Sequence, residues 1–224
     1  MSDKVLGPGP HTRVRRLPEK ARYDEDTINA ILDEARFCTL AGVVDGLAMA
    51  LPTLHAREGR TLYLHGSQSN ALMKSVLAAR RAALCVTIYD GLRLARSGFE
   101  SSIAYRSAVV VGAVRLIGEE REKARVLDLF VDAVLAGRSS EVRPMTSQEQ
   151  RLTMVLALTI EEASAKVSAG PTDDPVEDQA LEIWSGVVPA RMVFGAPIAS
   201  SDGAMASGTV ELPESLRRLL DNPS

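Results

Sequence analysis

The stretch TLYLHGSQSNALMKSV, residues 61 to 76, combines two periodicities separated by a turn. Leu62 and Leu64 alternate with Tyr63 and His65, which predicts a strand with two different faces. From Leu72 onward the apolar residues recur at helical spacing, which predicts a helix. The chain therefore changes from strand to helix across a short turn of small and hydroxyl residues.

This turn has the residue types of an anion site. Gly66 permits a tight turn and a close approach to a ligand. Ser69 or Asn70 is a candidate N-cap for the helix, whose first N–H groups favour negative charge. Ser67 adds a hydroxyl and Lys74 adds a full positive charge. A phosphate cradle and an ordinary capped helix with a solvated lysine both fit these residues, because the glycine spacing of a P-loop is absent.

The composition of the 224 residues is that of a globular domain, with 46% hydrophobic and 25% charged residues. The net charge of −3 disfavours nucleic acid as a partner. No apolar run approaches the length of about 20 residues that spans a bilayer, and the first residues lack the apolar core of a signal peptide. We expect a cytoplasmic protein with no nucleic-acid or membrane partner, and with its two cysteines as free thiols.

The order of elements predicts an α+β domain. Short strands follow one another between residues 37 and 67, and Asp45-Gly46 and Asp90-Gly91 are two hairpin signals. Gly112 interrupts a long strand and suggests a bulge. A helix covers residues 119–136, and a strand pair is expected in residues 154–170. We predict a strongly coiled antiparallel sheet of six or seven core strands, closed as a barrel, with inserted helices.

Three regions are expected along the chain. Residues 1–22 form an N-terminal arm that is disordered or laid across a partner subunit. Residues 23–204 form the barrel domain, and residues 205–224 form a tail with a short helix.

The histidines do not form a metal site by spacing. His11, His55 and His65 share no helical face, so no zinc site is expected. His65, at the end of its strand, is open to two interpretations, a hydrogen-bonded structural residue or a catalytic one. No serine–histidine–aspartate order with a nucleophile elbow can be traced.

A resemblance emerges from the whole succession of motifs: TLYLHGS followed by Lys74, then ALCVTIYDGLRLARS, YRSAVVVGAVRLIGEEREK, ASAKVSAGP and WSGVVP. In this order the chain resembles the pyridoxamine 5′-phosphate oxidase-related flavoproteins from about Tyr23 to Ile198. It is most similar to their nitroimidazole-resistance branch. The resemblance implies an antiparallel split β-barrel that forms a homodimer with FMN at the subunit interface.

The resemblance also implies roles for individual residues. His65 matches the histidine beside the flavin ring, and is the implied catalytic residue. Where many relatives have a basic residue this chain has Ala71, and Lys74, one turn further on, replaces it. The implied cofactor-binding residues are Leu51, Pro52, Thr53, His65, Gly66, Ser67, Ser69, Asn70, Lys74, Tyr105, Ser107 and Trp184. Trp184 fits a core or interface position as well as a place near the site.

The chain departs from the family where relatives often read Phe-His-His-Ser, since it reads Phe99-Glu100-Ser101-Ser102. Any acid–base or ligand role of those histidines is therefore lost here. The resemblance implies an FMN-dependent oxidoreductase that passes electrons from a nicotinamide to a small electron-poor acceptor, in the manner of a nitroreductase. The alternatives are a carrier or sensor that binds FMN without turnover, and a haem- or deazaflavin-binding protein of the same fold. Haem would need an axial ligand from His55, His65, a cysteine or a tyrosine.

Overall fold

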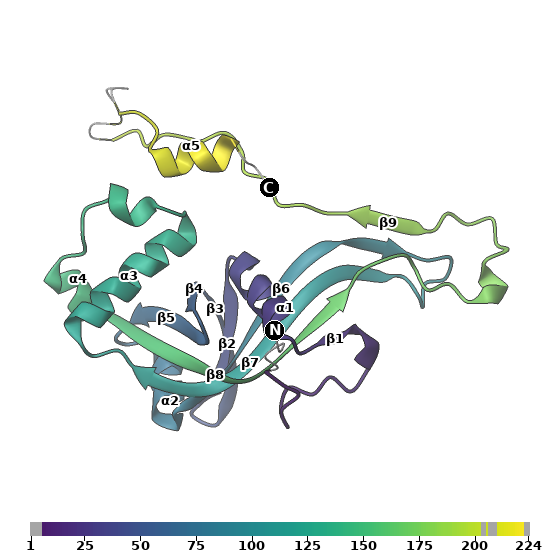
Figure 1. Cartoon of the computed structure of the whole chain (residues 1–224), viewed down its shortest axis with the longest axis horizontal. Helices are drawn as coiled ribbons and strands as arrows, with labels where there is room; N and C mark the ends of the chain where they lie inside the picture. The colour runs from purple at the N-terminus through teal and green to yellow at the C-terminus, as the bar shows by residue number, and fades with distance from the viewer. Residues whose placement is uncertain (1–5, 203–204, 206–209, 222–224) are drawn as a thin grey trace.

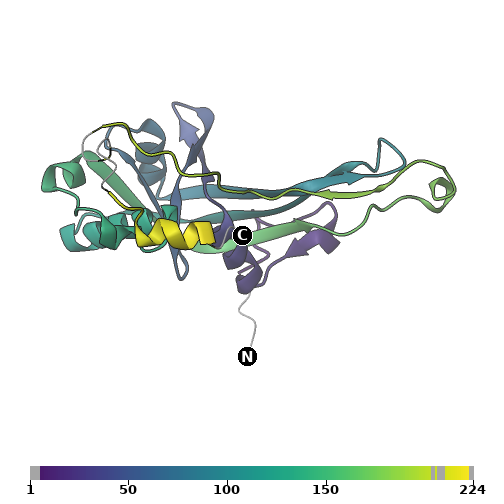
Figure 2. The ribbon, with the colours of Figure 1, turned by 90° about the horizontal axis from the view of Figure 1, so that it is seen from above.

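The computed structural model describes residues 6–202, 205 and 210–221. These residues form an α+β domain on one coiled antiparallel sheet of nine strands (Figure 1). The predicted fold class is therefore confirmed, with more strands than the six or seven expected. Figure 2 shows the same sheet from above, with a long extension at one end of the molecule.

The strands are β1 (Ala21–Arg22), β2 (Cys38–Val44), β3 (Leu47–Thr53), β4 (His55–Glu58), β5 (Thr61–Ser67), β6 (Arg81–Leu94), β7 (Ser102–Leu116), β8 (Thr153–Ser168) and β9 (Gly186–Pro189). The helices are α1 (Glu25–Glu34), α2 (Ala71–Ala79), α3 (Glu120–Val134), α4 (Ser147–Leu152) and α5 (Glu214–Asp221), with short 3-10 helices η1 (Pro18–Lys20), η2 (Arg138–Glu141) and η3 (Val176–Asp178).

The sheet closes into a barrel through a single residue. Its strand order is β3-β2-β6-β7-β8-β5-β4, so β3 and β4 lie at opposite ends of the order. Only Leu54 separates these two strands along the chain. The two ends of the sheet must therefore meet, which leaves few free edges.

Two apolar clusters fill the structure. The larger one lies inside the barrel and includes Leu62 and Leu64 of β5. The smaller one lies between the sheet and α3 and includes Tyr63 of β5 and Phe130 of α3. The alternation in β5 thus separates two packed faces, as its period of two predicts.

The predicted turns differ in outcome. Asp45-Gly46 forms the β2–β3 hairpin, and both residues have the positive φ, 50° and 80°, that a tight hairpin turn needs. The prediction of a turn at Asp90-Gly91 is wrong, because β6 continues to Leu94. Gly91 instead marks a bulge, with a φ of 141°, where a Cβ would meet the carbonyl oxygen of Val188 in β9 at 2.2 Å.

The predicted strand pair after α4 is also wrong, because β8 is one strand of 16 residues. The register between β7 and β8 shifts at Val111/Gly112, which confirms the bulge predicted at Gly112. A Cβ on Gly112 would lie 1.9 Å from the carbonyl oxygen of Thr159. The local bend keeps the strand paired where two hairpin strands were expected.

The described part of the N-terminal arm lies along β8 of its own chain. Leu6 is buried, and its backbone bonds to Tyr23 and Ala163. The backbone N–H and Nδ1 of His11 lie 3.1 and 2.6 Å from the mostly buried carboxylate of Glu162. From residue 6 on, the arm is therefore ordered against the barrel, in place of the disorder or partner contact expected.

Two long segments leave the barrel. The β6–β7 extension consists of the outer halves of these strands with β9 paired along β6 (Figure 1). After β9, residues 190–202 return over the body, and α5 lies beside α3 in both views. No helix among the described residues is long and apolar enough to span a membrane.

Candidate functional site

The turn from β5 to α2 has the geometry that the sequence predicts. Asn70 is the N-cap, and its side chain accepts a hydrogen bond from the Met73 N–H at 3.0 Å. The hydroxyls of Ser67 and Ser69 lie 2.8 Å apart. Lys74 is exposed and forms no ion pair with a residue that the structure describes. The turn therefore presents hydroxyl groups, a helix N-terminus and an unpaired cation at one place on the surface.

Gly66 has a packing role at this turn. A Cβ there would lie 2.6 Å from the sulfur of Met73, which is buried in α2. Helix α2 in turn packs on β2, where Gly42 leaves space for Val76. The absence of a side chain at residue 66 thus lets α2 start close to the sheet.

Strand β3 carries three of the predicted cofactor-binding residues: Leu51, Pro52 and Thr53. It pairs with β2 within the described residues, and most of its side chains on both faces are exposed. Leu47, for example, is 68% exposed. An apolar strand that is bare on both faces is unusual in an isolated domain, so β3 has the character of a contact surface.

His65 lies on the face of β5 that packs against α3. Its ring centroid is 4.3 Å from that of Phe130, with the ring planes tilted by 55°. Nδ1 is buried, and neither ring nitrogen bonds to a described residue. Burial lowers the pKa of His65 from its ordinary value of 6.5, so the imidazole is neutral at pH 7. A neutral, half-buried imidazole with unsatisfied nitrogens is suited to contact a bound group.

His55 has a different environment. It is 5% exposed, and Nε2 donates to the carbonyl oxygen of Leu32 at 2.8 Å. Burial lowers the pKa of His55 as well. Because this nitrogen already has a partner that fixes α1 to β4, His55 has the character of a structural residue.

Tyr105, Ser107 and Trp184 lie far from His65 within one chain. His65 pairs with Val155 of β8, whereas Tyr105 pairs with Ser168 of the same strand. These partners are thirteen residues apart, which is about 40 Å along a strand at about 3.3 Å per residue. Trp184 precedes β9 on the outer part of the extension, where it is 65% exposed. The predicted site residues therefore form two groups.

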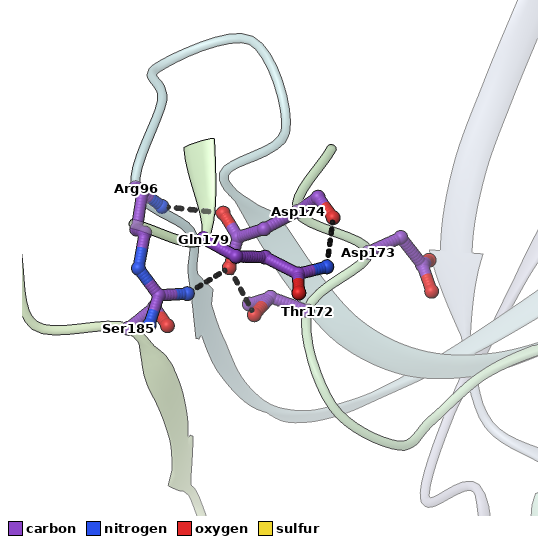
Figure 3. Close-up of a pocket in the computed structure, with 6 residues that line it drawn as sticks. All are labelled: Arg96, Thr172, Asp173, Asp174, Gln179 and Ser185. Carbon is purple, nitrogen blue, oxygen red and sulfur yellow. Dashed lines mark hydrogen bonds and ion pairs between the residues drawn. The ribbon is translucent and has the colours of Figure 1, made fainter. Parts of the chain in front are cut away.

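A polar cavity of about 540 Å³ lies on the β6–β7 extension (Figure 3). Inside it, Arg96 pairs with Asp174 at 2.9 Å, and Thr172 bonds to the same carboxylate. The Arg96 backbone N–H is the main cause that holds the pKa of Asp174 below its ordinary value. These groups satisfy one another and fix the loop after β8 to the extension, so we assign the cavity a structural role.

Comparisons with known proteins identify the class. The family model for pyridoxamine 5′-phosphate oxidase matches residues 24–167. The chain belongs to this family, and the resemblance drawn from the sequence is confirmed. No curated protein sequence matches the chain.

Two solved structures are similar over nearly the whole chain. The flavocytochrome Anf3 from Azotobacter vinelandii has 34% identity and a TM-score of 0.88, and the alignment covers 94% of this chain and 96% of that one. An FAD- and haem-binding protein from Mycobacterium smegmatis has 37% identity and a TM-score of 0.83, with 89% and 96% covered. A structure described as a 5-nitroimidazole antibiotic resistance protein, from Bacteroides thetaiotaomicron, has 20% identity and a TM-score of 0.56, with 66% and 86% covered, and shows the fold alone.

The sequence analysis did not predict the contact between His65 and Phe130. Phe130 belongs to the apolar stripe of α3, which predicts burial but not the strand it covers. The return of the chain after β9 to α3 was also missed, because residues 190–202 have no periodicity that specifies a place on the barrel.

Proposed function

We propose that this protein is a flavin-binding oxidoreductase that also binds haem, with His65 as the axial ligand of the haem. The observation that carries the proposal is the neutral, half-buried imidazole of His65, whose ring nitrogens bond to no described residue. The two relatives above 30% identity support it, because one is a flavocytochrome and the other binds FAD and haem.

The turn from β5 to α2 fits a flavin phosphate. Ser67, Ser69 and Lys74 would hold it, with the first N–H groups of α2. The exposed apolar face of β3, with Leu51, would lie against the isoalloxazine ring. A bound flavin supplies the hydride and electron chemistry, and the protein holds it and selects what reaches it. The family resemblance favours FMN, whereas the Mycobacterium smegmatis relative binds FAD.

A homodimer accounts for the two separated groups of site residues. A residue about 40 Å away along β8 cannot act on a flavin held at Ser67 of the same chain. A two-fold axis would bring the extension of one protomer, with Trp184, to the cradle of the other. The exposed apolar side chains of β3 would then be buried in the interface.

Haem fits the surroundings of His65. Iron is ligated by a neutral imidazole nitrogen, which burial maintains here. Phe130 supplies an aromatic contact beside the ring. His55 is a weaker candidate because its Nε2 is already bonded to Leu32.

A second function is a flavin oxidoreductase without haem. In it, electrons pass from a nicotinamide to a small electron-poor acceptor, and His65 donates a proton. Its position two residues before Ser67 of the cradle favours this role. The lowered pKa disfavours it, because little imidazolium is present at neutral pH.

Absorption spectra test both functions. The protein, expressed with haem supplied, should show flavin bands and a Soret band, and chromatography of the released flavin identifies FMN or FAD. His65→Ala should lose the Soret band and keep the flavin. Retention of both bands would contradict axial ligation by His65. A wild type with flavin alone would support the second function if His65→Ala slows anaerobic flavin reoxidation by a nitroaromatic about 10²-fold per bound flavin. A colourless protein would contradict both.

A further inference from the structure

The segment after β9 lies outside the family core. We call residues 190–202 together with α5 the C-terminal strap. The family model ends at residue 167. The flavocytochrome alignment covers 94% of the 224 residues and leaves only about 13 outside, fewer than the strap contains. Part of the strap therefore lies within the region shared with a haem-containing relative.

The strap is tied to the body near both of its ends. Near its start, the Phe194 ring lies under the guanidinium of Arg36 at 5.5 Å. At α5, the backbone N–H of Ser215 donates to Glu141 of η2 at 2.9 Å, and the Ser215 hydroxyl donates to the same carboxylate. Ser215 is buried by this contact. Since η2 follows α3, this pin holds α5 at the end of the helix that carries Phe130.

An apolar surface leads from His65 towards the pin. Phe130 contacts the His65 ring, and Val134 follows it by one turn on the same face of α3. Val134 ends the helix and is 60% exposed. The strap also presents apolar side chains without cover, including Ile198 at 97% exposure. Two bare apolar surfaces on adjacent segments indicate that a large apolar group lies between them.

We propose that the C-terminal strap closes the haem site, and that the Ser215–Glu141 pin holds it over the apolar surface that runs from Phe130 to Val134. The inference rests on the haem binding proposed above. Haem has a broad apolar plane, which requires more cover than α3 and His65 provide. The strap supplies that cover and excludes water.

Haem transfer tests the strap separately from haem binding itself. Glu141→Ala and Ser215→Ala are compared with the wild type for the rate at which haem passes to apomyoglobin, followed at the Soret band. Each variant should release haem about fivefold faster or more, the scale of one charged hydrogen bond at the surface. The double variant should match the faster single variant, because both changes break the same pin. Arg218→Ala removes an ion pair within α5, to Glu214 at 3.1 Å, and serves as the matched control.

The outcomes separate the two proposals. Haem that binds and leaves at the wild-type rate in both pin variants would overturn the role of the strap and leave the haem site standing. Faster loss of flavin, or of the dimer, with haem retained would also overturn it, because the strap would then cover something else. A wild type that takes up no haem would overturn both. A melting temperature within a few degrees of the wild type checks that the variants fold.

Discussion

A composite site makes a specific prediction for Trp184, the only tryptophan in the chain. Its emission reports on one position at the β6–β7 extension. In a single chain, the extension and the cradle are separated by about 40 Å along β8, so a flavin at Ser67 would quench Trp184 weakly. In a two-fold dimer the flavin of one protomer lies near the Trp184 of the other. Flavin binding should then quench most of the emission.

Mixed dimers give the magnitude. Lys74→Ala weakens the cradle but keeps its tryptophan, whereas Trp184→Phe binds flavin but is silent. After equal amounts are mixed and the subunits exchanged at random, about half of the Lys74→Ala protomers have a Trp184→Phe partner. At a flavin concentration that fills only intact cradles, about half of the emission should be quenched in the mixture. Lys74→Ala alone should show little quenching.

The assay is a flavin titration of the apoprotein, followed by tryptophan fluorescence, with light scattering of the same samples. Wild-type emission that stays constant when flavin is saturating would refute the composite site. So would a mixture that is quenched no more than Lys74→Ala alone. A particle of 24.1 kDa with flavin still bound would refute the dimer itself.

Three further predictions concern the cradle, the backbone and the buried histidine. Lys74→Ala should weaken FMN binding by about 1.5–3 kcal/mol and leave riboflavin unchanged, because only FMN carries the phosphate; equal weakening of both in titrations would exclude a phosphate contact. In urea unfolding, Gly112→Ala should cost more stability than Gly66→Ala, which should cost about 1–3 kcal/mol, because a backbone oxygen cannot move aside as Met73 can. Gly118→Ala, with nothing within 4 Å, is the control and should be near neutral; equal costs at all three would contradict the argument. The pKa of His55 is lowered by burial, so the unfolded chain takes up a proton more readily and stability falls as the pH drops below 6.5; the melting temperature of His55→Gln should fall less between pH 7 and 5, and an unchanged slope would contradict this.

The fold could be predicted from the sequence where local chemistry decides the outcome. Asp45-Gly46 makes its hairpin because the turn needs two residues of positive φ, and the chain supplies suitable ones. The same dipeptide type at Asp90-Gly91 failed, because β9 approaches Gly91 from a distant part of the chain. A hairpin and a bulge with a close neighbour can have the same local sequence, and only the tertiary contact distinguishes them.

The candidate site divides in the same way. The cap at Asn70 and the grouping of Ser67, Ser69 and Lys74 follow from spacing along seven or eight residues, which the structure reproduces. The separation of His65 from Tyr105 depends on the register of β8 with two strands, and no local pattern encodes that register. The assignment of individual residues to a cofactor stays a prediction.

The segments outside the family core determine what the core can do. Residues 24–167 include the cradle and His65, and so provide one phosphate site and one free imidazole. They leave β3 bare and the apolar face of α3 open at Val134. The N-terminal arm covers neither surface, because its described residues lie on β8. A second chain at β3 and the C-terminal strap at α3 are the covers that this chain itself can supply. Since a flavin at the first surface and a haem at the second would both be shielded from water, electrons would move between them in a medium of low dielectric, where protein groups have their strongest influence on redox potential. A relative without the strap would keep the flavin site and expose the other, which is why the strap, and not the barrel, is the segment to alter first.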